Sequence, residues 1–384
     1  MAKTLDNRVV GMAAAMILIV GMGFGRFAFT GLYPLMVDEH ILSIAGGSWA
    51  ASANYAGYLV GALALAKLQA KEAAAVGIAA LVGTVLCLAL LGFADALWLV
   101  IAVRALAGGL SAAAMVAGSL WLLQHMGQSH AAPALYAGVG IGIFLSAELI
   151  AAGAAAGLTS QTVWLGLAAV AALMTAFSCR VLQQSKRQPP APAAVPTAGG
   201  GKSALNHPWQ LIAVYGLAGL GYIITATYLP VLIGGALGGA APLHIWAVFG
   251  LGAAPSCFLW HYLNRRLGTR KSLLLNLLVQ GFGVLLPALS QTTGAYLVSA
   301  VLVGGTFMGT VTIAMPAARL LNARVGFNML AVMTAVYGVG QIVGPLIANA
   351  IFDYSGSFAG SLVFAAAALW LATVLCLPKF GGSE

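Results

Sequence analysis

The chain has 384 residues, of which 61% are hydrophobic and only 7% charged, and its formal net charge is +9. A soluble protein covers its surface with roughly 25% charged residues, so this composition excludes a water-soluble globular fold. In hydrocarbon every backbone N–H and C=O must be paired internally, which leaves a helix bundle or a closed barrel. The apolar runs are about 20 residues or longer, and this length selects helices over short alternating strands.

Twelve apolar segments are predicted to span a membrane, six on each side of the chain's midpoint. They are Val9–Met36, Gly46–Ala66, Ala74–Gly92, Leu97–Leu123, Ala132–Ala155, Val163–Val181, Trp209–Ile233, Leu243–Leu263, Ser272–Leu289, Ala295–Leu320, Asn328–Phe352 and Ser357–Leu377. The first segment contains an arginine and lacks a clear small-residue cleavage site, so a membrane helix is predicted there rather than a signal peptide.

A polar stretch rich in proline, alanine and glycine separates the two sets of segments, at residues 183–207. Such a composition cannot bury a core, and it indicates a flexible linker. We therefore predict an N-terminal six-helix bundle over residues 1–182 and a C-terminal six-helix bundle over residues 208–384.

The positive charges predict the orientation. With twelve spans, both termini and the linker lie on one side, and that side holds Lys3, Arg8, Lys67, Lys71, Arg180, Lys186, Arg187, Lys202, Arg265, Arg266, Arg270, Lys271, Arg319, Arg324 and Lys379. The opposite connections hold Asp38, Glu39, His40, Asp95 and Asp353 but no lysine or arginine. Because lysine and arginine collect in cytoplasmic loops, both termini are predicted to be cytoplasmic, in an inner (plasma) membrane. The basic charge is thus a topology signal, and no nucleic-acid partner is expected.

Glycines suggest an internal repeat. Shifting the first half by 196 residues places Gly23 on Gly219 and Gly25 on Gly221, and further along it places Gly108 on Gly304. Two related halves of equal topology are typical of transporters built from parallel repeats.

Three charged residues lie deep within the predicted spans, namely Arg26, Arg104 and Glu148. A charge at the bilayer centre costs at least ~2.5–3.5 kcal/mol on insertion scales, so each is expected to be paired or to face a wet cavity. At 1.5 Å per residue, all three lie about 10–15 Å from the same membrane surface. Equal depth permits contact between them without requiring it.

Two interpretations of Arg104 and Glu148 are open. They form a buried ion pair that joins two helices, or Glu148 takes up and releases a proton as its pairing with arginine changes. For Arg26 the alternatives are a carbonyl-capping or lipid-directed side chain and a fixed positive charge that receives an anionic substrate.

Several polar residues are candidate substrate ligands. Thr30 and Tyr33 follow Arg26 on one helical stripe, and Tyr222 is its counterpart in the second half. Softer candidates are Asn54, Tyr58 and Gln341, which could equally bridge helices. The histidines, cysteines and carboxylates form no metal-type cluster, and no nucleotide-binding motif is present, so neither a metal nor a cofactor is expected.

Two motifs resemble the major facilitator superfamily. Arg104 followed by Gly108 and Gly109 is similar to its fourth-helix motif, and Arg266, Gly268, Arg270 and Lys271 resemble its cytoplasmic loop motif. Arg265 stands there in place of the usual aspartate. The resemblance implies an all-α fold of two pseudo-symmetric six-helix halves, alternating access, and a cavity lined chiefly by helices 1, 4, 7 and 10.

The segments 25–30 and 52–58 resemble the YbfB/YjiJ-like branch of that superfamily more narrowly. This resemblance implies alternating access but no particular substrate. The charges at Arg26, Arg104 and Glu148 lead us to expect a monomeric, proton-coupled secondary transporter of a small organic anion or metabolite, and not an enzyme. The alternative is a multidrug or toxic-compound exporter that exchanges its cargo for protons.

Overall fold

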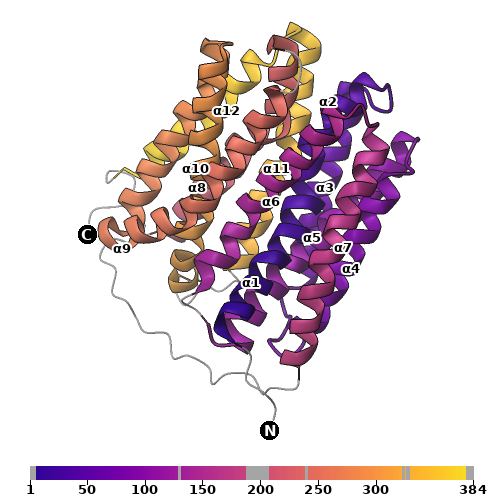
Figure 1. The fold of residues 1–384 in the computed structure, drawn as a ribbon. Helices are drawn as coiled ribbons and strands as arrows, with labels where there is room; N and C mark the ends of the chain where they lie inside the picture. The colour runs from indigo at the N-terminus through magenta and orange to yellow at the C-terminus, as the bar shows by residue number, and fades with distance from the viewer. Residues whose placement is uncertain are drawn as a thin grey trace. The chain divides into compact units, whose positions relative to one another are not determined.

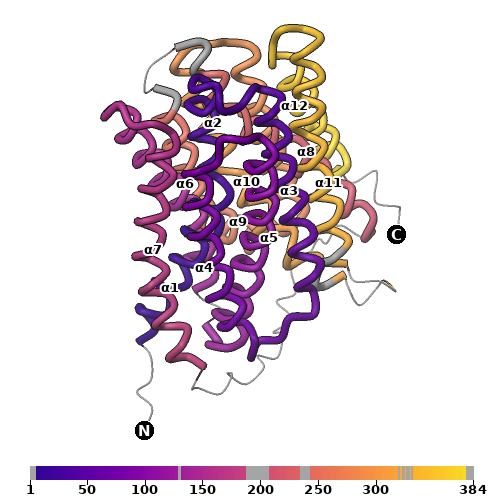
Figure 2. Tube along the Cα trace, turned by 90° about the vertical axis from the view of Figure 1, so that its right-hand side faces the viewer, coloured from indigo at the N-terminus to yellow at the C-terminus, as the bar shows by residue number. Residues whose placement is uncertain are grey.

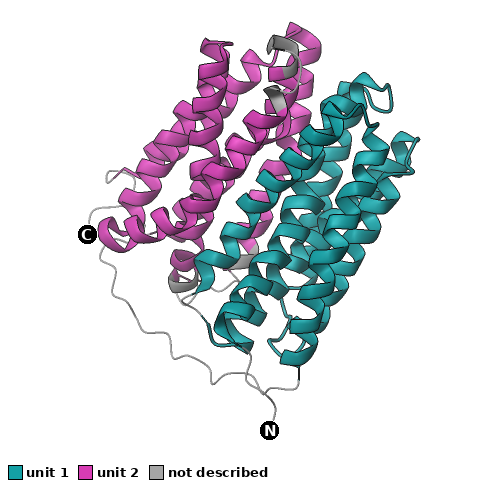
Figure 3. Ribbon diagram, viewed as in Figure 1, with its two compact units in different colours: residues 1–198 teal, residues 199–384 magenta. Residues whose placement is uncertain are grey.

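The structure is a computed structural model that describes residues 6–128, 131–186, 207–237, 241–321, 325 and 329–377. These residues are helical apart from short connections. Most of the predicted linker lies outside the described residues, as do Lys3, Arg187, Lys202, Arg324 and Lys379. The chain divides into two compact units, Met1–Ala198 and Gly199–Glu384 (Figure 3).

Unit 1 is built from seven α-helices and two π-helical segments in its described part (Figure 1). They are α1 (Asn7–Leu18), η1 (Ile19–Phe27), α2 (Ala28–Asp38), α3 (Ile44–Ala64), α4 (Ala73–Leu91), α5 (Leu97–Leu120), η2 (Trp121–His125), α6 (Ala132–Ala155) and α7 (Ser160–Ser185). Figures 1 and 2 show α4 beside α5 and α7. Helix α7 continues to Ser185, into the range predicted for the linker.

Unit 2 contains α8 (Pro208–Leu237), α9 (Ala241–Leu289), α10 (Thr293–Leu321), α11 (Met329–Ser355) and α12 (Ala359–Leu375). Helix α9 covers 49 residues, where two spans joined by a loop were predicted. Gly268 alone leaves the helical conformation inside it, with φ 79° and ψ 165°. The two predicted spans are therefore two helices that meet at a kink, and the loop predicted over residues 264–271 is reduced to Gly268.

The first predicted span is one continuous helical run from Asn7 to Asp38, but its middle, η1, is a π-helix. Gly21, Gly23 and Gly25 lie in this segment. A Cβ on Gly23 would overlap the backbone of Gly142 in α6. Because its glycines have no side chains, η1 contacts neighbouring helices through backbone atoms. Short π-helical segments are frequent at functional sites.

Nine helical segments among the described residues are long and apolar enough to cross a membrane. Helix α3 is not among them because Ser48, Ser52 and Asn54 lower its hydropathy, and α12 has only 17 residues. Length and composition thus support a multi-pass membrane protein.

The two units repeat one backbone contact. In unit 1 a Cβ on Gly108 of α5 would overlap the Asn54 carbonyl oxygen of α3. In unit 2 a Cβ on Gly304 of α10 would overlap the Phe249 carbonyl oxygen of α9. Gly108 and Gly304 are related by the shift of 196 residues seen in the sequence.

Candidate functional site

The backbone carbonyls of η1 are bonded by side chains of α5. Ser111 Oγ donates to the Gly21 carbonyl at 2.6 Å. Arg104 Nη1 donates to the Gly25 carbonyl and Nη2 to the Arg26 carbonyl, each at 3.1 Å. A π-helix displaces carbonyls from the regular α-helical pairing, and these two side chains satisfy those that face α5.

Arg104 is 1% exposed, and its guanidinium carbon lies 4.4 Å from the centre of the Phe29 ring. Its own carbonyl accepts a hydrogen bond from Asn54 Nδ2 of α3 at 2.9 Å. Arg104 thus ties η1, α3 and α5 together. Both terminal nitrogens of Arg104 bond to backbone oxygens of η1, a carbonyl-capping role that was considered for Arg26.

Arg26 has a different environment. It is 3% exposed, and its guanidinium carbon lies 4.3 Å from the ring centre of Tyr58, 4.8 Å from that of Tyr55 and 5.5 Å from that of Phe27. Within the described residues, Arg26 Nε and Nη1 are buried and have no hydrogen-bond partner. Arg26 is therefore a buried cation that aromatic rings stabilise without occupying these two donors.

Glu148 lies on α6, the helix that contacts η1 at Gly23 and Gly142. Its side chain is half-buried. The structure therefore places Glu148 on a helix packed against the segment that carries Arg26.

The remaining candidates of unit 1 occupy several places. Thr30 is buried on α2. The Tyr33 hydroxyl donates to the Ile44 carbonyl at 2.6 Å and helps to close the α2–α3 connection. Asn54 bridges α3 to α5, and its Oδ1 is buried without a partner in the described part of the chain.

In unit 2, Gln341 Nε2 of α11 donates to the hydroxyl of Tyr222 in α8. The Tyr222 ring stacks on Phe307 and on Tyr337, with ring centres 5.4 and 5.8 Å apart. Gln341 Oε1 is buried, with no hydrogen bond to any described residue. Tyr222 and Gln341, which were predicted on different helices, thus lie in contact.

The loop-motif residues surround the break in α9. The Arg266 guanidinium lies over the Tyr262 ring at 5.2 Å, and Lys271 is exposed. Arg270 Nε donates to the Cys376 carbonyl at 2.7 Å, at the end of α12. Gly268 has a positive φ, which allows the backbone to turn tightly between Arg266 and Arg270.

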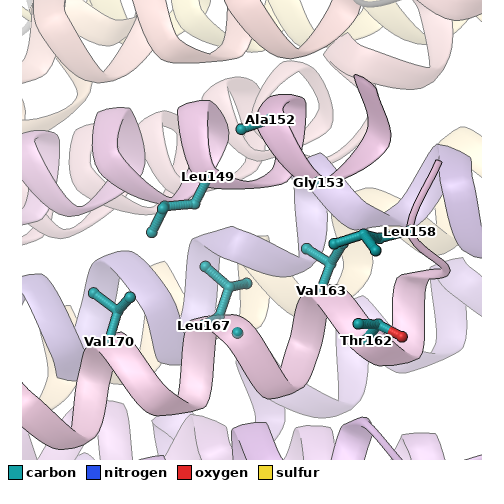
Figure 4. A pocket seen from close by; sticks show the side chains of 9 residues that line it. Leu149, Ala152, Gly153, Leu158, Thr162, Val163, Leu167 and Val170 are labelled. Atoms are coloured by element: carbon teal, nitrogen blue, oxygen red, sulfur yellow. The ribbon is translucent and has the colours of Figure 1, made fainter. Parts of the chain in front are cut away.

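A hollow of about 330 Å³ lies between α6 and α7 (Figure 4). Its lining is apolar apart from Thr162. It contains no charged side chain, so it does not provide the chemistry that Arg26 provides. The described residues hold no group of three or more His, Cys, Asp or Glu side chains that could bind a metal.

Sequence analysis missed Tyr55 and Ser111. Tyr55 lies three residues before Tyr58, a spacing that places both rings on one helix face and could have indicated a shared partner. Ser111 follows Arg104 by seven residues, which likewise places both on one face of α5.

Long apolar helices with a buried cation and polar residues inside them define an integral, multi-pass membrane protein. Residues 18–377 match the family described as uncharacterised MFS-type transporter YbfB. The match covers most of the chain, so the chain belongs to this family of the major facilitator superfamily, whose members act in membrane transport and are generally not enzymes. No curated protein matched the chain in the sequence comparison.

Proposed function

We propose that this chain is a proton-coupled secondary transporter of a small organic anion, and that Arg26 receives the anionic group. The observation that carries this proposal is the state of the Arg26 side chain, which is almost fully buried with two nitrogens unbonded. A charge in this position costs several kcal/mol of solvation, which a bound anion would offset.

Twelve membrane spans in two six-span halves form the proposed framework. It follows from dividing α9 at Gly268 and from counting α1, η1 and α2 as one span. The repeated contacts at Gly108 and Gly304 support two related halves. In this framework the protein is a monomer in the inner (plasma) membrane, with cytoplasmic termini, and it exposes its solute alternately to the two sides.

Proton coupling is assigned to Glu148. Its helix packs on η1, so a change in the charge of this carboxylate would act on the segment that carries Arg26. Arg104 is a less suitable coupling partner, because backbone carbonyls already bond its terminal nitrogens.

Uptake into proteoliposomes under an imposed pH gradient, acid outside, tests this function. Labelled organic anions are expected to accumulate with the wild type, to lose accumulation with Arg26→Ala, and to lose dependence on the gradient with Glu148→Gln. Equal accumulation by wild type and Arg26→Ala would exclude the anion site. Gradient-driven transport of amphipathic cations alone would instead establish the multidrug or toxic-compound exporter.

A further inference from the structure

The aromatic shell around Arg26 limits how a solute can approach this cation. Tyr55 and Tyr58 both lie on α3, and both ring centres are within 5 Å of the guanidinium carbon. Phe27, the next residue along η1, supplies a third ring at 5.5 Å. Within the described residues, neither Nε nor Nη1 has a hydrogen-bond partner beside these rings.

Partners of this kind leave both the charge and these donors available. A carboxylate beside Arg26 would neutralise the cation and take its N–H groups, whereas a ring attracts the cation through its π face and leaves the charge in place. The N–H groups of a guanidinium lie in its plane and match the two oxygens of a carboxylate. Nε and Nη1 point to different edges of this plane, so each of these buried nitrogens offers one hydrogen bond to an anionic oxygen that approaches along the guanidinium plane.

The second buried arginine does not extend this site. Arg104 is tied to the Gly25 and Arg26 carbonyls, and its guanidinium is packed against Phe29. A solute with two anionic groups would bring its second charge into the same low-dielectric region without an equivalent set of donors, which is strongly unfavourable.

We propose that Arg26 recognises one carboxylate group, that the transported class is the monocarboxylates, and that Tyr55 and Tyr58 are the residues that set this specificity. The proposal rests on the proposed anion site at Arg26. It adds the charge of the solute and the role of Tyr55.

Binding to the purified full-length protein in detergent tests the solute class. Thermal stabilisation is titrated with lactate and benzoate as monocarboxylates, and with succinate and sulfate as dianions, at matched ionic strength. We expect saturable stabilisation by at least one monocarboxylate and at least tenfold weaker binding of both dianions. Arg26→Gln should abolish the effect, and Arg180→Gln, at an exposed arginine of α7, should leave it unchanged.

The tyrosines are tested by the ratio of dianion to monocarboxylate dissociation constants. Tyr58→Phe keeps a ring and should keep the ratio within about twofold, whereas Tyr58→Leu removes the π partner and should lower it about tenfold or more. Tyr55→Leu should also lower this ratio, and this variant provides a second test if Tyr58→Leu does not fold. A role in packing alone would change the melting temperature but not this ratio.

The outcomes separate the two proposals. If dianions bind as tightly as monocarboxylates and Arg26→Gln abolishes the thermal stabilisation by both, the monocarboxylate assignment is overturned and the anion site at Arg26 stands. An unchanged ratio in the folded leucine variants would overturn the role of the tyrosines. If no anion gives a saturable shift, or if the shift persists in Arg26→Gln, both the assignment and the anion site fail.

Discussion

Two buried arginines in unit 1 use opposite sets of partners. Arg104 bonds to two backbone carbonyls, while Arg26 lies against three rings and, within the described residues, has two nitrogens without a hydrogen bond. The difference agrees with the roles we propose, in which Arg104 positions η1 and Arg26 binds the solute. Since Arg104 Nη2 bonds to the carbonyl of Arg26 itself, the first arginine fixes the backbone from which the second one extends.

Replacing each arginine by methionine separates these roles. Arg104→Met leaves the Gly25 and Arg26 carbonyls without their donors, at about 1–3 kcal/mol for each buried group, and should lower the melting temperature markedly. Arg26→Met removes a buried charge without breaking a hydrogen bond at Nε or Nη1, so stability should be unchanged or raised. Thermal unfolding in detergent measures both, and an equal loss of stability in the two variants would contradict the assignment.

The contacts of these side chains were not predicted from the sequence. Counting residues from the helix ends placed Arg26, Arg104 and Glu148 in one layer. Arg104 bonds to two carbonyls of the π-helical segment η1, and no residue type specifies such a segment uniquely. The ring partners of Arg26 depend on the rotation of α3, a helix whose polar and apolar residues do not segregate into a clear stripe.

Helix pairs in both units approach through glycine backbones. Gly108→Ala and Gly304→Ala would drive a Cβ into the carbonyl oxygens of Asn54 and Phe249, which belong to helix backbones and cannot move independently. Each of these two substitutions should lower the free energy of unfolding by about 1–3 kcal/mol or reduce the yield of folded protein. Their neighbours are matched controls, because a Cβ on Gly109 or Gly305 would lie 3.6 or 3.8 Å from the nearest oxygen.

Melting temperatures of the four alanine variants check this prediction. The account expects a loss of stability at the first glycine of each pair and little change at the second. A loss of similar size at all four positions would show that the contacts are not as described.

The break in α9 depends on one residue. Gly268 has φ 79° and ψ 165°, a region that is open essentially to glycine. Gly268→Ala should therefore cost about 1–3 kcal/mol by backbone strain. Gly294→Ala in α10 is the control, since nothing lies within 4 Å of a Cβ placed there. Equal melting temperatures for the two variants would contradict a strained turn at Gly268.

Element boundaries were predicted well where hydropathy changes abruptly, and less well elsewhere. Helix α6 runs from Ala132 to Ala155 as predicted, because an apolar run whose single charged residue is Glu148 has polar residues at both ends. The polar stretch inside α9 was taken for a loop. Its arginines stay helical, and only Gly268 leaves the helix.

At the scale of the whole molecule, the loop charges predict a sidedness that accessibility can measure. Asp95→Cys lies in a connection predicted to be outside, and Lys71→Cys in one predicted to be cytoplasmic. A membrane-impermeant thiol reagent should label the first in intact cells and the second only after permeabilisation. The parent protein serves as the blank, because three of its four cysteines are buried. Labelling of both variants from one side would contradict the proposed topology.

The division of the chain into two units, with the same glycine contact in each, agrees with the repeat read from the sequence. The repeat does not extend to the chemistry. Unit 1 contains the buried cation at Arg26, and the corresponding helix of unit 2 contains the Tyr222 hydroxyl bonded by Gln341. We expect the charge of the solute to be recognised by unit 1.

Counterflow in proteoliposomes tests this central claim most directly, because it needs neither a known coupling ion nor a known direction. Vesicles loaded with unlabelled lactate or benzoate are diluted into a trace of the labelled acid, with protein-free vesicles as the blank. The account predicts transient accumulation by wild type and Arg180→Gln and none by a folded Arg26→Gln. Accumulation by Arg26→Gln equal to that of the wild type would contradict it.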